Sequence, residues 1–225
     1  MSTYLIIILS IIAVPLLLSF ERRILFVRKW PAVFCSIFFV GIFYVSWDAL
    51  ASKRGDWWFN SEHILGLKLF TLPIEEILFF VVAPFSCLFV YEVIKFFHPD
   101  KHIKIKKFRV NTLLLLSLGL AFFCSMRHYT ALSFFSVSVF LFIARKHFFV
   151  VLESANFWIY MMICYVPFLI FNGILTSLPV VQYNPLAIIG WRFGTIPVED
   201  FIYNFAYLGF IALAYKFFDS KFQRS

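Results

Sequence analysis

The sequence predicts an all-α, polytopic membrane protein of about seven transmembrane helices, built as two parallel three-helix repeats joined by a linking helix. Three observations predict this fold class: the composition, a series of long stretches almost free of charge, and an internal repeat. Of the 225 residues, 62% are hydrophobic, 22% are aromatic and only 14% are charged. A soluble domain of this length could not bury so much apolar surface, so we expect the chain to lie in a lipid bilayer.

Stretches of about 18–22 residues with almost no charge are long enough to cross a hydrocarbon core of roughly 30 Å as helices. They place the expected spans at residues 2–20, 31–50, 73–96, 110–126, 129–144, 155–175 and 196–217. We expect the first to be a retained span and not a signal peptide. No basic region precedes it, and no small-residue cleavage site follows it.

The basic residues predict the orientation of these spans. Fifteen of the 20 Lys and Arg residues fall on one side of the membrane, and five fall on the other. Cytosolic loops carry the excess of basic residues, so we expect a multi-pass protein of the cell (inner) membrane with its N-terminus outside and its C-terminus in the cytosol. The basic run at 101–109 then lies against anionic membrane lipid, and we expect no nucleic-acid partner.

The cysteines, histidines and glycines predict neither a metal site nor a bound cofactor. The four cysteines stand singly in different spans, and no pair of histidines has the spacing of metal ligands. None of the eight glycines forms a G-x-G-x-x-G pattern, which a dinucleotide would need.

An internal repeat carries most of the functional information. Nine chemically matched positions recur 124 residues apart without a gap, which is far beyond a chance match. The pairs are Phe59 and Tyr183, Asn60 and Asn184, Ile64 and Ile188, Gly66 and Gly190, Lys68 and Arg192, Thr71 and Thr195, Pro73 and Pro197, Glu75 and Glu199, and Glu76 and Asp200.

The repeat divides the chain into two halves and a connection. Residues 1–97 form the first repeat with three spans, 98–127 hold the basic cytosolic loop and the linking span, and 128–225 form the second repeat. Three spans plus the linking span make an even shift from one half to the other, so both halves run in the same direction and an axis along the membrane normal relates them. We therefore expect the two acidic motifs to meet at one pocket near the outer leaflet.

The acidic pairs Glu75–Glu76 and Glu199–Asp200 are the predicted catalytic residues. A Thr-x-Pro-x-Glu pattern is also an ordinary helix start, with Thr as the cap and Pro in the first turn. Carboxyl groups facing lipid are costly, however, so acids on membrane helices are expected to face the protein interior. We expect a functional role in addition to capping.

Helical spacing surrounds these acids with aromatic side chains. Phe79 shares a face with Glu75, Tyr203 shares a face with Glu199, and Asn204 follows Asp200 by one turn. A carboxylic acid in an apolar chamber tends to stay protonated, as a general acid must. When two acids lie close together, their pKa values move apart, which gives one proton donor and one ionised partner. The faces of aromatic rings stabilise a carbocation.

Several further residues are expected to support the site. Asp48 is either a third acid or a polar residue at a helix end, and Asn172 is its counterpart in the second half. Lys68 and Arg192 either pair with the acids or extend toward the outer surface. Trp57, Trp58 and Trp191 are expected mainly as interfacial anchors. The expected supporting and substrate-binding residues are Asp48, Asn60, Lys68, Phe79, Asn172, Asn184, Arg192, Tyr203 and Asn204.

With these motifs in place, the chain resembles the lycopene cyclase family of small membrane proteins from bacteria and archaea. The resemblance rests on the two Pro-x-Glu-acid motifs, on the matched residues that precede them, and on the Trp47–Asp48 pair. Members of this family occur as two subunits or as one fused chain, and a related domain occurs in fungal bifunctional enzymes. The resemblance covers essentially the whole chain and fits the fused form.

The resemblance implies a redox-neutral ring closure on lycopene taken from the bilayer. An acid protonates the terminal double bond, the neighbouring alkene attacks the cation, and a base removes a proton to leave a β-ionone ring. By the motif match, the acids and bases are Glu75, Glu76, Glu199 and Asp200. The sequence predicts neither which of them donates the proton nor an oligomeric state.

Two other functions remain open at this point. A proton-coupled transporter would suit parallel repeats with intramembrane acids, although here the acids cluster at one depth. A membrane prenyltransferase also forms carbocations, but it would need D-x-x-x-D motifs that bind Mg²⁺ and diphosphate.

Overall fold

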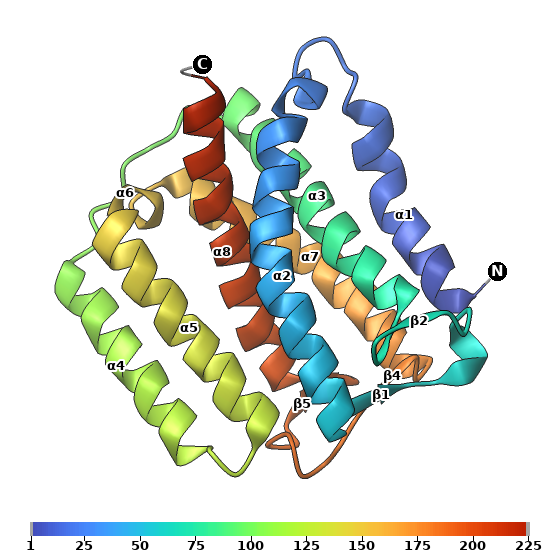
Figure 1. Cartoon of the computed structure of the whole chain (residues 1–225). Helices are drawn as coiled ribbons and strands as arrows, with labels where there is room; N and C mark the ends of the chain where they lie inside the picture. Colours follow the sequence, from blue (N-terminus) through green and yellow to red (C-terminus); the bar gives the residue numbers. More distant parts are fainter. Residues whose placement is uncertain (1, 224–225) are drawn as a thin grey trace.

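Long apolar helices make up most of the chain, seen here in a computed structural model that describes residues 2–223 (Figure 1). Each predicted span coincides with one helix, with ends that differ by a few residues. The helices are α1 (Thr3–Leu18), α2 (Trp30–Arg54), α3 (Ile74–Phe97), α4 (Lys107–Phe123), α5 (His128–His147), the short α6 (Phe149–Leu152), α7 (Ala155–Ser177) and α8 (Val198–Phe222). Two 3₁₀ turns, η1 (Phe26–Lys29) and η2 (Ser61–His63), complete the helical part.

Five of these helices are long and apolar enough to cross a membrane: α2 together with η1, α3, α5, α7 and α8. The apolar α1 is shorter than this group. The chain is therefore an all-α, polytopic membrane protein, as its composition predicts. Helix α2 runs past its predicted end to Arg54, with Lys53 and Arg54 in its last turn. Basic side chains are favourable there because they face the negative end of the helix dipole.

The helices pack in a reciprocal pattern between the two halves. Helix α1 packs on α3, and α5 packs on α8 in the same way. The second long helix of each half crosses to the other half, so that α2 packs on α8 and α7 packs on α3. Helix α4 packs on α5 at one edge of the bundle (Figure 1). This exchange places α3 and α8, which carry the acidic motifs, at the centre.

Short strands that the sequence did not reveal lie at one end of the bundle (Figure 1). Strand β1 (Trp57–Phe59) pairs antiparallel with β4 (Val181–Tyr183) and so joins the two halves. The central partners of this pairing, Trp58 and Gln182, are themselves 124 residues apart. The 124-residue offset of the sequence repeat therefore also separates the central residues of the two paired strands.

Each acidic motif is preceded by a small hairpin. Strands β2 (Lys68–Leu69) and β3 (Leu72–Pro73) form the first, and β5 (Arg192–Phe193) and β6 (Ile196–Pro197) form the second in the same register. Both hairpins turn through a residue with positive φ, at Phe70 (56°) and at Gly194 (60°). Glycine accepts this conformation without strain, whereas Phe70 is an exception among bulky residues.

The predicted caps by threonine are wrong. No side chain caps α3 or α8, and both helices begin directly after their proline. The Thr71 hydroxyl instead donates to the carbonyl oxygen of Ala49 at 2.9 Å, and the Thr195 hydroxyl lies 3.4 Å from that of Gly173. Thr71 and Thr195 thus tie each hairpin to the second long helix of its own half.

The packing of α5 on α8 predicts that one glycine cannot be enlarged. A Cβ atom on Gly209 would lie 2.6 Å from the ring of the fully buried Phe140. We expect Gly209→Ala to lower the free energy of unfolding by about 1–3 kcal/mol, as overpacking does in other cores. Thermal unfolding in detergent measures this, with Gly41→Ala as control, since nothing lies within 4 Å of its added Cβ. Equal stability of the two variants would contradict the tight α5–α8 contact.

Candidate active site

A cavity of about 290 Å³ opens between α1, α3, α7 and α8 beneath the β1–β4 strands. Three carboxyl groups line it: Asp48 from α2, Glu76 from α3 and Asp200 from α8. Most of its other lining residues are aromatic or aliphatic, and Phe79, Phe80, Tyr203 and Tyr207 are among them. The predicted meeting of the two acidic motifs at one aromatic chamber is thus present in the structure.

Asp48 and Glu76 lie together on the first-half side of this cavity. The indole Nε1 of Trp57 donates to Asp48 Oδ1 at 2.7 Å, and the hydroxyl of Tyr4 donates to Glu76 Oε2 at 2.5 Å. Both carboxyl groups line the same cavity. Of the two readings open for Asp48, the structure favours an acid in the site, because the side chain is 2% exposed and faces the cavity.

Asp200 on the second-half side has different partners. Its Oδ1 accepts a hydrogen bond from the Tyr129 hydroxyl at 2.6 Å. Its Oδ2 accepts from Asn172 Nδ2 and from the Tyr183 hydroxyl, both at 2.8 Å. Three donors therefore converge on one carboxyl group.

Tyr183 belongs to strand β4, outside the helices. Burial raises the pKa of the Tyr183 hydroxyl well above its ordinary value near 10, and the nearby Asp200 charge raises it further. The hydroxyl consequently stays protonated and acts as a donor to Asp200 at any physiological pH.

Glu75 and Glu199 occupy a separate environment behind the cavity. Both are completely buried and neither lines the cavity. Glu75 Oε1 accepts from Leu65 N–H and the Ser2 hydroxyl, at 2.6 and 2.7 Å. Glu199 Oε1 accepts from Ile189 N–H and the Thr130 hydroxyl, at 2.7 and 2.6 Å. These two glutamates, predicted as acids alongside their neighbours, fasten the loop before each motif to the helix that carries it.

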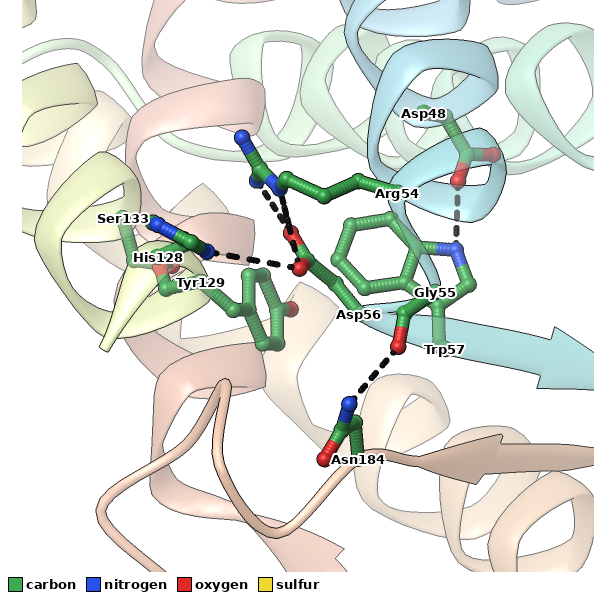
Figure 2. A network of polar contacts seen from close by, with 9 residues as sticks. All are labelled: Asp48, Arg54, Gly55, Asp56, Trp57, His128, Tyr129, Ser133 and Asn184. Atoms are coloured by element: carbon green, nitrogen blue, oxygen red, sulfur yellow. Dashed lines mark hydrogen bonds and ion pairs between the residues drawn. The ribbon is translucent and has the colours of Figure 1, made fainter. Parts of the chain in front are cut away.

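The loop between α2 and β1 is held by a polar network that spans both halves (Figure 2). The buried Asp56 accepts hydrogen bonds from the Arg54 guanidinium, and its Oδ1 lies 3.7 Å from His128 Nδ1 at the start of α5. Asn184 Nδ2 donates to the Gly55 carbonyl oxygen at 3.0 Å. Next to this network, the ring of Trp57 packs edge-on against Tyr129, with centroids 4.9 Å apart. The donors to Asp48 and Asp200 therefore support each other.

The predicted supporting residues divide into two groups. Phe79, Asn172, Tyr203 and Asn204 line the cavity with the acids. The remaining ones, Asn60, Lys68, Asn184 and Arg192, do not line it.

The second group has structural contacts outside the cavity. Asn60 and Asn184 accept from the backbone N–H two residues ahead, of Glu62 and Leu186, which shapes the loops after β1 and β4. Among residues 2–223, no ion pair joins Lys68 or Arg192 to an acid, and both side chains are exposed. Of the two readings for Lys68 and Arg192, extension toward the surface is the one observed.

Sequence reasoning missed the donors that surround the acids. Tyr4 and Tyr129 were not singled out, and Tyr183 was named only as a member of the repeat and not as a site residue. Trp57 was expected at the membrane interface but is 7% exposed. Tyr4 and Tyr129 open the first helix of each half, but they are 125 residues apart, so a search at an offset of 124 does not pair them. Within the described part of the chain, no three His, Cys, Asp or Glu side chains are grouped to hold a metal ion.

Comparison with known proteins bears on this site directly. A family model described as lycopene cyclase matches residues 1–94 and 126–218, so two segments of the chain match it in turn. These segments contain both acidic motifs and every residue of the hydrogen-bond network around the cavity. No curated protein and no solved structure gave a match.

The buried contacts of Glu199 predict a cost for removing one donor. Thr130→Val keeps the shape of the side chain but takes away a hydroxyl that bonds Glu199 Oε1. We expect the free energy of unfolding in detergent to fall by about 1–3 kcal/mol, the usual cost of an unmet buried hydrogen bond. The control is Ser133→Ala on the same helix, because that buried hydroxyl donates only to the backbone oxygen of Tyr129. A loss no larger than that of the control would show that Thr130 does not hold Glu199.

Proposed function

The chain belongs to the lycopene cyclase family, and we propose that it is a lycopene β-cyclase that closes the acyclic ends of lycopene into β-ionone rings. The reaction is an intramolecular addition of the lyase or isomerase type, in which the carotenoid is neither oxidised nor reduced. The products would be γ-carotene after one closure and β-carotene after two.

The proposed chemistry needs one acid, one base and a dry aromatic pocket. A carboxylic acid gives its proton to the terminal double bond, which leaves a tertiary carbocation. The electrons of the neighbouring double bond then form the new ring bond, and the positive charge moves onto the ring. A carboxylate removes a ring proton, whose bonding electrons become the ring double bond. One proton enters and one leaves, so the balance requires no cofactor.

The observation that carries this proposal is the cluster of Asp48, Glu76 and Asp200 at one end of an aromatic cavity. Acid and base are both available there within one enclosed space. The rings of Phe79, Tyr203 and Tyr207 line this space, and aromatic rings attract a cation through the negative side of their quadrupoles. The lining also includes apolar residues further along α1 and α3, such as Ile11, Pro15 and Val90, which suit a polyene chain.

The arrangement in the membrane is part of the proposal. We take α1 and α4 to cross the bilayer together with the five longer helices, which gives seven spans, an outer N-terminus and a cytosolic C-terminus. Residues 1–97 and 128–225 would then be parallel repeats, with residues 98–127 as the connection. The acids and strands would lie near the outer leaflet, and lycopene would enter from the lipid.

Pigment analysis in cells that accumulate lycopene tests the proposal. The intact chain is expected to convert lycopene into cyclic carotenoids, identified by chromatography and absorption spectra. Glu76→Gln and Asp200→Asn are each expected to lower β-ring formation by about 10²–10⁴-fold, the range typical for loss of an acid or base. Glu92→Gln is the matched control, since Glu92 pairs with Lys95 at the other end of α3. Unchanged lycopene beside intact protein in the membrane would rule out this substrate.

A further inference from the structure

We propose that the two halves divide the proton chemistry between them: the Asp48–Glu76 pair donates the proton, and Asp200 accepts it. This inference rests on the proposed cyclase function and deepens it. It follows from the hydrogen-bond partners of the three acids.

The oxygens of the first-half pair need a proton between them. Asp48 Oδ1 accepts from Trp57, whereas Asp48 Oδ2 is buried and receives no N–H or O–H donor from the described residues. The Glu76 carboxyl lines the same cavity. Two carboxylates carry acceptors only, so a hydrogen bond between Asp48 Oδ2 and the Glu76 carboxyl forms only if at least one of them is protonated. The pair therefore brings an acidic proton to the cavity.

The second half is built to hold a carboxylate. Three N–H and O–H donors meet the two oxygens of Asp200, and hydrogen bonds to the charged form of a carboxyl group stabilise that form. A protonated Asp200 would have to give up one of these contacts. Asp200 is therefore the acceptor that is ready before the reaction starts.

Two sequence differences between the halves create this asymmetry. Asn172 stands 124 residues after Asp48. The Asn172 amide donates a hydrogen bond to Asp200, whereas the Asp48 carboxyl can bond to another acid only through a shared proton. Tyr183 stands 124 residues after Phe59, and its hydroxyl supplies another donor that Phe59 lacks. Both differences act in the same direction, adding donors around Asp200 and leaving Glu76 with fewer.

The division of roles closes the proton cycle inside the cavity. The pair gives its proton to the terminal double bond, and the remaining charge is stabilised by Tyr4 and Trp57. After ring closure the cationic carbon has several neighbouring C–H bonds, and the position of the base decides which proton leaves. Asp200 takes the proton whose loss gives the β-ring, then returns it to the pair, with which it shares the cavity.

Product analysis with isolated membranes separates the two roles. Asp48→Asn and Glu76→Gln are expected to slow lycopene consumption by about 10²–10⁴-fold without changing the product. Asp200→Asn should still consume lycopene but yield other products, because the cation persists. These are rings with the double bond at another position, or hydroxylated chains after capture by water. Glu92→Gln controls for the substitution itself, and thermal unfolding in detergent verifies that each variant is folded.

The result that would overturn the assignment is the reverse pattern. If Asp48→Asn keeps the wild-type rate, or if Asp200→Asn blocks consumption while the first-half variants give isomer mixtures, the roles are wrong. Complete loss in Asp200→Asn without new products also contradicts its role as acceptor. If the wild-type chain itself leaves lycopene unchanged, the proposed function fails, and the division of roles fails with it.

An exchange variant tests the same idea without relying on loss alone. Asp48→Asn combined with Asn172→Asp moves the shared proton to the second half, beside Asp200, and leaves Glu76 with an amide donor. We expect this double variant to cyclise lycopene faster than Asp48→Asn alone, because an acid pair and an ionised partner are both restored. No gain over the single variant would show that the carboxyl at Asp48 does not act by sharing a proton.

Discussion

Buried carboxyl groups must find hydrogen-bond partners, and this requirement organises the end of the bundle where the strands lie. Asp48, Glu75, Glu199 and Asp200 are each at most 5% exposed. A charge or polar group buried without partners would cost several kcal/mol in such surroundings. The tyrosines, the indole, the hydroxyls and the loop amides at this end donate to at least one oxygen of each group, and Asp200 receives donors on both. Asp48 Oδ2, Glu75 Oε2 and Glu199 Oε2 receive no donor from the described residues.

The acids form two layers with different tasks. Glu75 and Glu199 each accept one backbone N–H and one hydroxyl, so they hold a loop against a helix. Their neighbours Glu76 and Asp200 reach the cavity. Adjacent residues on a helix point about 100° apart, so one carboxyl of each motif can hold the preceding loop while the next faces the cavity.

The strand pairing links these layers across the two halves. Because β1 and β4 pair around Trp58 and Gln182, Trp57 and Tyr183 lie opposite each other, and each donates to an acid of its own half. In a fused chain the two halves can diverge in sequence without losing this strand pairing. Asp48 against Asn172 and Phe59 against Tyr183 are two of the differences that lie at the cavity, and they help to make its two sides chemically unequal.

The all-α membrane class, the approximate span ends and both acidic motifs are predicted by the sequence alone, and so are seven of the residues that line the cavity. Those are Asp48, Glu76, Phe79, Asn172, Asp200, Tyr203 and Asn204. Charge-free length and a fixed repeat offset are properties of the chain itself, so they can be read without a structure.

Which acid of each motif faces the cavity depends on how the helices pack, because both positions of an adjacent acidic pair satisfy the same sequence pattern. The donors Tyr4, Trp57 and Tyr129 lie 72, 9 and 71 residues from their acids Glu76, Asp48 and Asp200. Two of these three contacts join different helices, and they exist only once those helices are packed together. The short strands likewise depend on their distant partners, since two or three residues carry no strand signal of their own.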